Sequence, residues 1–91
     1  MRSFEAFKRE TLKNPAIKRE YDAIEEEFAI ANELAGARAK AKLSQAQVAK
    51  RMGTSQSAVA RIESGRSPSL NSLRRYAKAV GRKLEIRLKA S

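Results

Sequence analysis

Residues 44–65, SQAQVAKRMGTSQSAVARIESG, decide how this chain folds. Ser44 is a favourable N-cap, and Gln47 three residues later can bond the cap's own N–H, so a helix is predicted to begin here. Gly53 can take the positive φ that ends a helix, because glycine has no Cβ to clash. The chain is therefore expected to leave this first short helix at Gly53.

A second short helix is predicted to follow at once. Thr54 and Ser55 offer another N-cap, and Gly65 ends the run. The apolar residues fall on one face of each helix: Val48, Ala49 and Met52 on the first, and Ala58, Val59 and Ile62 on the second. These two faces are expected to pack together across the short turn, which leaves the opposite face of the second helix for a polar partner.

The outer face of the second helix has the character of a helix-turn-helix DNA reader, whose second helix enters the major groove. Arg61 can donate two hydrogen bonds to guanine O6 and N7, and Gln56 can pair with adenine N6 and N7. Ser57 can contact a base or a phosphate, and Ala60 leaves room for a thymine methyl group. Any amphipathic helix pair with a glycine between is the alternative, but it does not explain why caps, small residues and polar face fall at compatible offsets.

The same stretch and the following SPSLNSLRRYAKAVG, residues 67–81, closely resemble the Cro/phage-repressor (XRE) family. The resemblance implies that Gln45 holds a DNA phosphate, as does the loop from Ser67 to Asn71. Further phosphate contacts are predicted at basic or hydroxyl side chains near the reader: Lys50, Arg51, Ser55, Arg66 and Arg74. The fold class predicted is mainly α, a five-helix-type phage-repressor-like domain with an N-terminal helical arm and a short C-terminal β-strand.

Length and composition argue against several classes of function. Ninety-one residues suffice for one small domain without a deep cleft, and the chain has neither His nor Cys. We therefore expect no enzyme activity, no catalytic residues, no bound metal, no cofactor and no disulfide. Because no apolar run approaches membrane-spanning length, a cytoplasmic protein is expected, associated with the nucleoid when DNA is bound.

Charge is distributed unevenly along the chain. The net charge is +10, and residues 44–91 carry eleven Lys and Arg against two Glu, whereas residues 1–43 carry nine against eight acidic residues. The excess therefore lies in the half that holds the predicted reader, which indicates a polyanionic partner such as double-stranded DNA.

The N-terminal segment, residues 1–28, is predicted to be a partner-binding arm. A marginal helix capped by Ser3 is expected within residues 1–13, and Asn14 with Pro15 begins a second helix. Apolar side chains then recur at helical spacing at Ile17, Tyr21, Ile24 and Phe28, beside a cluster of carboxylates. The stripe is read either as a face packed on its own domain or as a set of anchors for a basic protein, and the pattern alone does not decide.

The reader domain is predicted to span residues 29–81. Residues 29–43 form its first helix, in which Gly36 would permit a close helix crossing, and the sequence leaves open whether this helix continues the arm. A helix capped by Ser69 and ended by Gly81 closes the domain; Leu70, Leu73, Ala77 and Val80 face inward, with Tyr76 at their border.

Residues 82–91 are predicted to form a C-terminal β-strand. Apolar Leu84, Ile86 and Leu88 alternate with charged residues, which is the pattern of a half-buried strand. Because a lone strand leaves its backbone groups unpaired, we expect dimerisation through this segment, and a dimer would favour a palindromic operator.

The whole chain resembles HigA-type antitoxins, which are encoded beside a RelE-like, mRNA-cleaving toxin (HigB-type). Three pieces carry the resemblance together: NPAIKREYDAIEEEFAIA (14–31), TSQSAVARIESGRSPSL (54–70) and GRKLEIRL (81–88). It implies an N-terminal segment that neutralises the toxin and a homodimeric domain that represses its own operon. A stand-alone XRE-family regulator without a toxin is the alternative; an RNA- or ribosome-binding protein is weaker, since the basic half has only Tyr76 as an aromatic platform.

Overall fold

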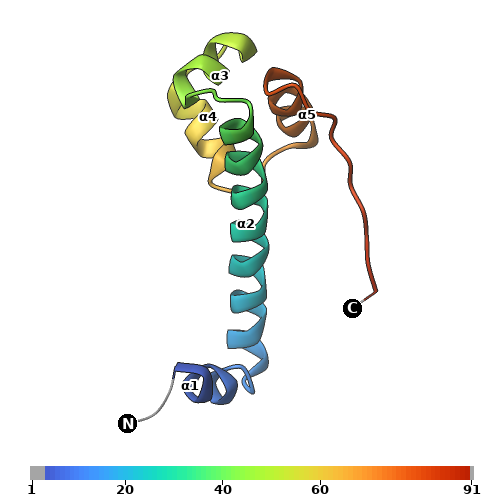
Figure 1. Ribbon diagram of the computed structural model, residues 1–91. Helices are drawn as coiled ribbons and strands as arrows, with labels where there is room; N and C mark the ends of the chain where they lie inside the picture. The colour runs from blue at the N-terminus through green and yellow to red at the C-terminus, as the bar shows by residue number, and fades with distance from the viewer. Residues whose placement is uncertain (1–3, 91) are drawn as a thin grey trace.

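The computed structural model describes residues 4–90, which contain helices and no strand. The helices are α1 (Phe4–Thr11), α2 (Pro15–Lys40), α3 (Gln45–Met52), α4 (Gln56–Glu63) and α5 (Leu70–Ala79). Figure 1 shows α2 as a long rod, with α3, α4 and α5 gathered around its C-terminal end and α1 across its N-terminal end. The mainly helical class is confirmed. The expected cap Ser3 lies outside the described residues.

Helix α2 joins the arm to the reader without a break. It begins as predicted, because the Asn14 side chain accepts a hydrogen bond from the Ala16 N–H at 3.0 Å and Pro15 occupies the first turn. It then runs for 26 residues, since residues 16–35 contain neither proline nor glycine to stop it. The question left open by the sequence is answered: the two expected helices are one, and residue 28 lies inside it.

The helix pair α3 and α4 has the local structure that its sequence predicts. The Ser44 side chain accepts from the Gln47 N–H at 3.1 Å, while the Ser44 N–H donates to Gln47 Oε1 at 2.8 Å, a complete capping box. Gly53 ends α3 in the left-handed region, with φ 68° and ψ 37°. Ser55 then caps α4 by accepting from the Ala58 N–H at 3.1 Å.

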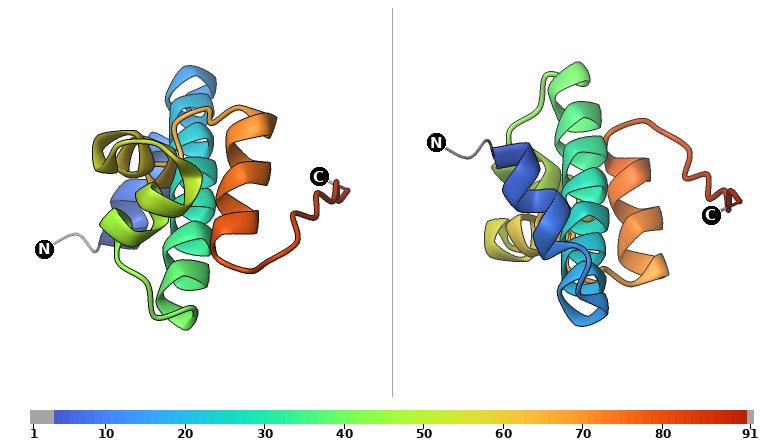
Figure 2. Two further views of the ribbon diagram at one scale, coloured as in Figure 1. Left: turned by 90° about the horizontal axis from the view of Figure 1, so that it is seen from above. Right: turned by 90° about the horizontal axis from the view of Figure 1, so that it is seen from below.

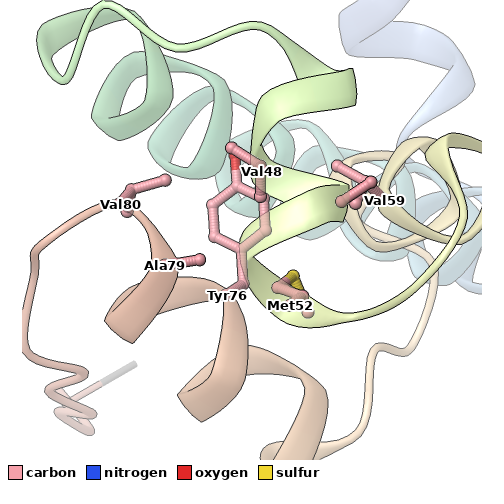
Figure 3. Close-up of a cluster of buried hydrophobic side chains, with 7 residues drawn as sticks. Val48, Met52, Val59, Tyr76, Ala79 and Val80 are labelled. Atoms are coloured by element: carbon pink, nitrogen blue, oxygen red, sulfur yellow. The ribbon is translucent and has the colours of Figure 1, made fainter.

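The core lies where α3, α4 and α5 meet (Figure 3). Its buried apolar residues are Val48, Ala49, Met52, Val59, Tyr76, Ala79 and Val80. Two predicted positions are corrected. Tyr76, expected at the border, is fully buried, and its hydroxyl finds polar partners inside the domain. Leu70, expected inside, is 45% exposed, because it is the first residue of α5 and the core contacts come from later turns.

Gly65, in the turn after α4, lies against the backbone of α2. A Cβ at Gly65, where φ is +75°, would lie 2.1 Å from the Glu27 carbonyl oxygen. At Gly36, by contrast, a Cβ would meet no atom within 4 Å, so the close crossing expected there is absent. The turn after α4 is therefore seated directly on the α2 backbone. Figure 2 shows α4 and α5 on opposite flanks of α2 in both views.

The predicted C-terminal β-strand is wrong for the described residues. Residues 82–90 leave α5 as an extended segment without strand structure, well separated from the lower part of α2 (Figure 1). Leu84 is half-buried, but Ile86 is 63% and Leu88 97% exposed. A strand needs a second strand to pair its backbone groups, and the described part of this chain has none to offer. The predicted five-helix reader is also corrected. The described residues contain five helices in all, and α1 belongs to the arm, so the reader is built from four.

Candidate DNA-binding surface

Helix α4 presents the predicted base readers to solvent. Gln56, Ser57, Ala60 and Arg61 are all exposed, while Val59 on the opposite face is fully buried. The cap, the turn and the buried face together determine which side of α4 points outward. A duplex can therefore approach the N-terminal turns of α4 without any rearrangement of the core.

Two predicted phosphate contacts also hold the protein together. Arg51 Nη1 donates to the Ala79 carbonyl at 2.9 Å, where it satisfies the C-terminal end of α5. Gln45 Nε2 donates one hydrogen to Glu63 Oε1 at 3.3 Å, which leaves its second amide hydrogen for a phosphate. The other predicted phosphate residues are exposed: Lys50, Ser55, Arg66, Ser67, Asn71 and Arg74. The Ser55 oxygen already accepts the cap bond, but its hydroxyl hydrogen can still be donated.

Beneath this surface lies an ion pair between buried Glu63 and partly buried Arg38, which the sequence interpretation missed. Glu63 at the end of α4 is only 8% exposed, and its carboxylate accepts hydrogen bonds from three helices. The donors are Arg38 Nε (2.8 Å) and Nη2 (3.1 Å), Tyr76 Oη (2.8 Å) and Gln45 Nε2 (3.3 Å). The single Tyr76 hydrogen is shared with the Leu34 carbonyl oxygen at 2.9 Å. One carboxylate thus connects α2, α3, α4 and α5.

These contacts change the proton affinities of the groups involved. Burial by itself would raise the pKa of Glu63, but the hydrogen bonds from its three donors outweigh burial, and the pKa lies below its ordinary value. Burial, followed by the bond to Glu63, raises the pKa of Tyr76 far above that of a free phenol. The bond to Glu63 likewise raises the pKa of Arg38. The carboxylate is therefore ionised throughout the neutral range.

A signal for this ion pair was present in the sequence. Glu63 follows Val59 by four residues, which places a carboxylate on the buried face of α4. A carboxylate on an apolar face needs a paired cation, and Arg38 stands four residues after Leu34, which packs against the core. What the sequence could not supply was the pairing of these two residues, which are 25 positions apart.

The predicted partner stripe on α2 is mostly in solvent. Ile17 is 40%, Ile24 50% and Phe28 64% exposed, so these side chains are not core of their own domain. Tyr21 is half-buried, and Lys8 of α1 lies over its ring with Nζ 4.7 Å from the centroid. Helix α1 thus covers one anchor of the stripe and leaves the others open.

A groove brings part of this stripe to the reading helix. It is lined by Ile24, Glu27 and Phe28 of α2 and by Arg61, Ser64 and Arg66 at the end of α4 and just beyond. From the sequence, Ile24 and Phe28 are predicted to bind a protein partner and Arg61 to bind DNA, as separate surfaces. In the folded chain the two surfaces meet.

The predicted dimerisation residues lie on the other flank of the molecule. Leu84 and Ile86 line a shallow groove along α5, together with Leu70 and Ala77, while Leu88 projects into solvent. The side chains of Leu84, Ile86 and Leu88 therefore remain available to another molecule.

Comparison with known proteins gives one family match. A family model described as helix-turn-helix matches residues 34–86, more than half of the chain. No significant match was found among curated proteins or among solved structures. Among the helices described between residues 4 and 90, none combines the length and apolarity needed to cross a bilayer.

Proposed function

We propose that this chain, which belongs to the helix-turn-helix family through residues 34–86, is an antitoxin that represses its own operon. Its DNA-binding domain is of the XRE type, and this family match indicates a sequence-specific transcriptional regulator. The observation that carries the DNA-binding part is the outer face of α4, where Gln56 and Arg61 stand exposed above a packed core. The DNA read is expected to be the region upstream of the gene itself.

The DNA part is tested by replacing one base reader. Arg61→Ala is expected to weaken binding to the upstream DNA by about 1 to 3 kcal/mol, because a bidentate contact to guanine is lost, and to leave binding to random DNA nearly unchanged. Fluorescence anisotropy with both duplexes measures this. Arg9→Ala, which removes the same charge at an exposed position of α1, is the control and should bind like the wild type. Equal losses on both duplexes would place Arg61 on a phosphate.

The antitoxin part is supported by the exposed stripe and its carboxylates. Ile17, Ile24 and Phe28 offer apolar anchors that the domain does not use for its own packing. Exposed carboxylates accompany them along α2: Glu20, Glu25 and Glu26. Carboxylates beside a DNA reader repel DNA, so they fit a basic protein better, and an mRNA-cleaving toxin of the RelE type must be basic to bind phosphates. An amphipathic helix lying on such a surface is a common mode of recognition.

The antitoxin part is tested by shortening the arm. Deletion of residues 1–22 together with Ile24→Ala and Phe28→Ala removes α1 and the apolar stripe but keeps Glu27, on which Gly65 is seated. We expect the shortened protein to lose binding and neutralisation of a RelE-like protein encoded in an adjacent reading frame. Operator binding and the melting temperature should be retained. A shortened protein that still rescues cells from the toxin would show that the arm is not the neutralising segment, whereas a full-length protein that fails to rescue them would favour a stand-alone regulator.

A further inference from the structure

We propose that a partner protein seated on Ile24 and Phe28 and operator DNA held by Arg61 exclude each other, because both occupy the groove between α2 and α4. This inference rests on the proposed function, since it concerns the relation between its two binding activities. The partner meant is the basic protein that the arm would neutralise. Exclusion would make the partner a direct antagonist of repression.

The geometry of the groove carries the argument. One wall comes from α2 and holds Ile24, Glu27 and Phe28; the other comes from the end of α4 and holds Arg61, Ser64 and Arg66. The walls cannot separate easily, because the Gly65 turn lies so close to the Glu27 carbonyl that no Cβ would fit between them. Any ligand of one wall therefore stands directly before the other.

The size of a protein interface leads to the same result. A stable complex covers about 800 Å² on each partner, a patch with a radius of about 16 Å. A helix with its side chains is only about 10 to 12 Å across. A partner centred on Phe28, which is 64% exposed, would therefore extend beyond α2 and over Arg61. In the same way, a duplex that receives α4 in its major groove would cover Phe28.

The charges assign each wall to a different ligand. On the α2 side the groove is lined by Glu27, and α2 exposes further carboxylates at Glu20 and Glu25, which fit a basic partner. On the α4 side it ends in Arg61 and Arg66, which fit DNA. The partner protein cannot bind the α2 wall without covering the α4 wall, and DNA cannot bind the α4 wall without covering the α2 wall.

The absence of cysteine from the chain makes the groove easy to test. Phe28→Cys places one thiol in the groove, and Ile17→Cys places one on the same stripe, about 16 Å further along α2 at 1.5 Å per residue. Each variant is coupled to a bulky maleimide dye, and its affinity for upstream DNA is compared with that of the uncoupled variant. We expect coupling at position 28 to weaken operator binding at least tenfold and coupling at position 17 to change it less than twofold.

The reverse experiment uses DNA to protect the thiol. Saturating operator should slow maleimide modification of Phe28→Cys at least fivefold, while Ile17→Cys should react at its free rate. The competition itself is measured by titrating the adjacent-frame protein into the protein–operator complex, which should release the DNA. The inference is overturned if dye at position 28 leaves operator affinity unchanged, or if a stable ternary complex forms. Because wild-type operator binding and toxin binding are measured first, failure of either proposed activity is seen separately.

Discussion

At the scale of single residues, Gly65 and Glu63 hold the reading helix against its neighbours. Gly65 allows the turn after α4 to lie against the α2 backbone, and Glu63 ties the last turn of α4 to three other helices. Neither residue faces the DNA surface. Both nevertheless fix the direction of Arg61, which lies two positions before Glu63 and four positions before Gly65.

Alanine variants of Gly53 and Gly65 distinguish the cost of a steric clash from the cost of a positive φ. Gly53→Ala should destabilise the domain by about 1 to 2 kcal/mol, because alanine resists positive φ but meets no atom within 4 Å. Gly65→Ala has the same backbone cost and also a Cβ 2.1 Å from the Glu27 oxygen, so about 1 to 3 kcal/mol more should be lost. Urea unfolding of both variants measures the difference. Equal losses would mean that the seat on α2 contributes nothing.

The buried carboxylate should make stability depend on pH. Glu63→Gln leaves Arg38 without its anion, and a loss of about 3 kcal/mol is expected at pH 7. Because the folded pKa of Glu63 is lowered, the stabilisation is complete above the ordinary glutamate pKa and disappears as the pH falls through the folded pKa. The difference between wild type and variant should therefore shrink below about pH 4.

Unfolding in urea at pH 7 and pH 3 tests this dependence. Glu85→Gln is the matched control, because the pair that Glu85 makes with Arg87 at 2.8 Å is exposed. It should cost less than about 1 kcal/mol at either pH. A Glu63→Gln variant as stable as the control would show that the buried pair is not needed for folding.

At the scale of elements, the C-terminal segment differs from the described helices because it has no regular secondary structure. Helices α2 to α5 each have a cap at both ends, whereas residues 82–90 are extended and expose apolar side chains. An extended segment that belongs to no sheet can pair with the same segment of a second copy, as the alternating pattern predicts. A dimer of this kind would place two reading helices about 34 Å apart along DNA.

Ile86→Lys should disrupt such a dimer. Ile86 is 63% exposed in the single chain, so a lysine there costs the monomer little but would bury a charge between two paired segments. Light scattering should show a monomer, with a large loss of affinity for a palindromic site. Glu85→Lys, one residue away on the other face, is the control and should remain dimeric. A dimeric Ile86→Lys protein would move the interface elsewhere, with the arm as the next candidate.

The elements also show what sequence could predict. Ser44, Gly53 and Ser55 were assigned correctly, because caps and positive φ depend on chemistry within a few residues. The partners of Glu63 could not be assigned, since Arg38 is 25 positions away and only the packing of α2 on α4 brings them together. The strand was wrong because its pattern describes a pairing that one chain cannot make by itself.

At the scale of the whole molecule, two regions of different charge are joined by α2. The half that contains the reader carries most of the excess positive charge, and the arm carries most of the carboxylates. The shared groove could not be foreseen from this division, because it depends on how closely the end of α4 approaches Phe28. The base readers and the partner stripe remain predictions, which the variants above can test one residue at a time.

The unbroken course of α2 also places arm and reader in a fixed rotational phase. Along 26 residues the helix contains no point at which the arm could turn independently. One residue inserted after Asp22 would rotate Ile17 and Tyr21 by about 100° around the axis relative to α4, whereas seven inserted residues would return them to within about 20°. The number of residues in α2 therefore sets the direction in which the arm faces around the helix axis. Insertions tolerated in related proteins at this place should add a whole number of helical turns.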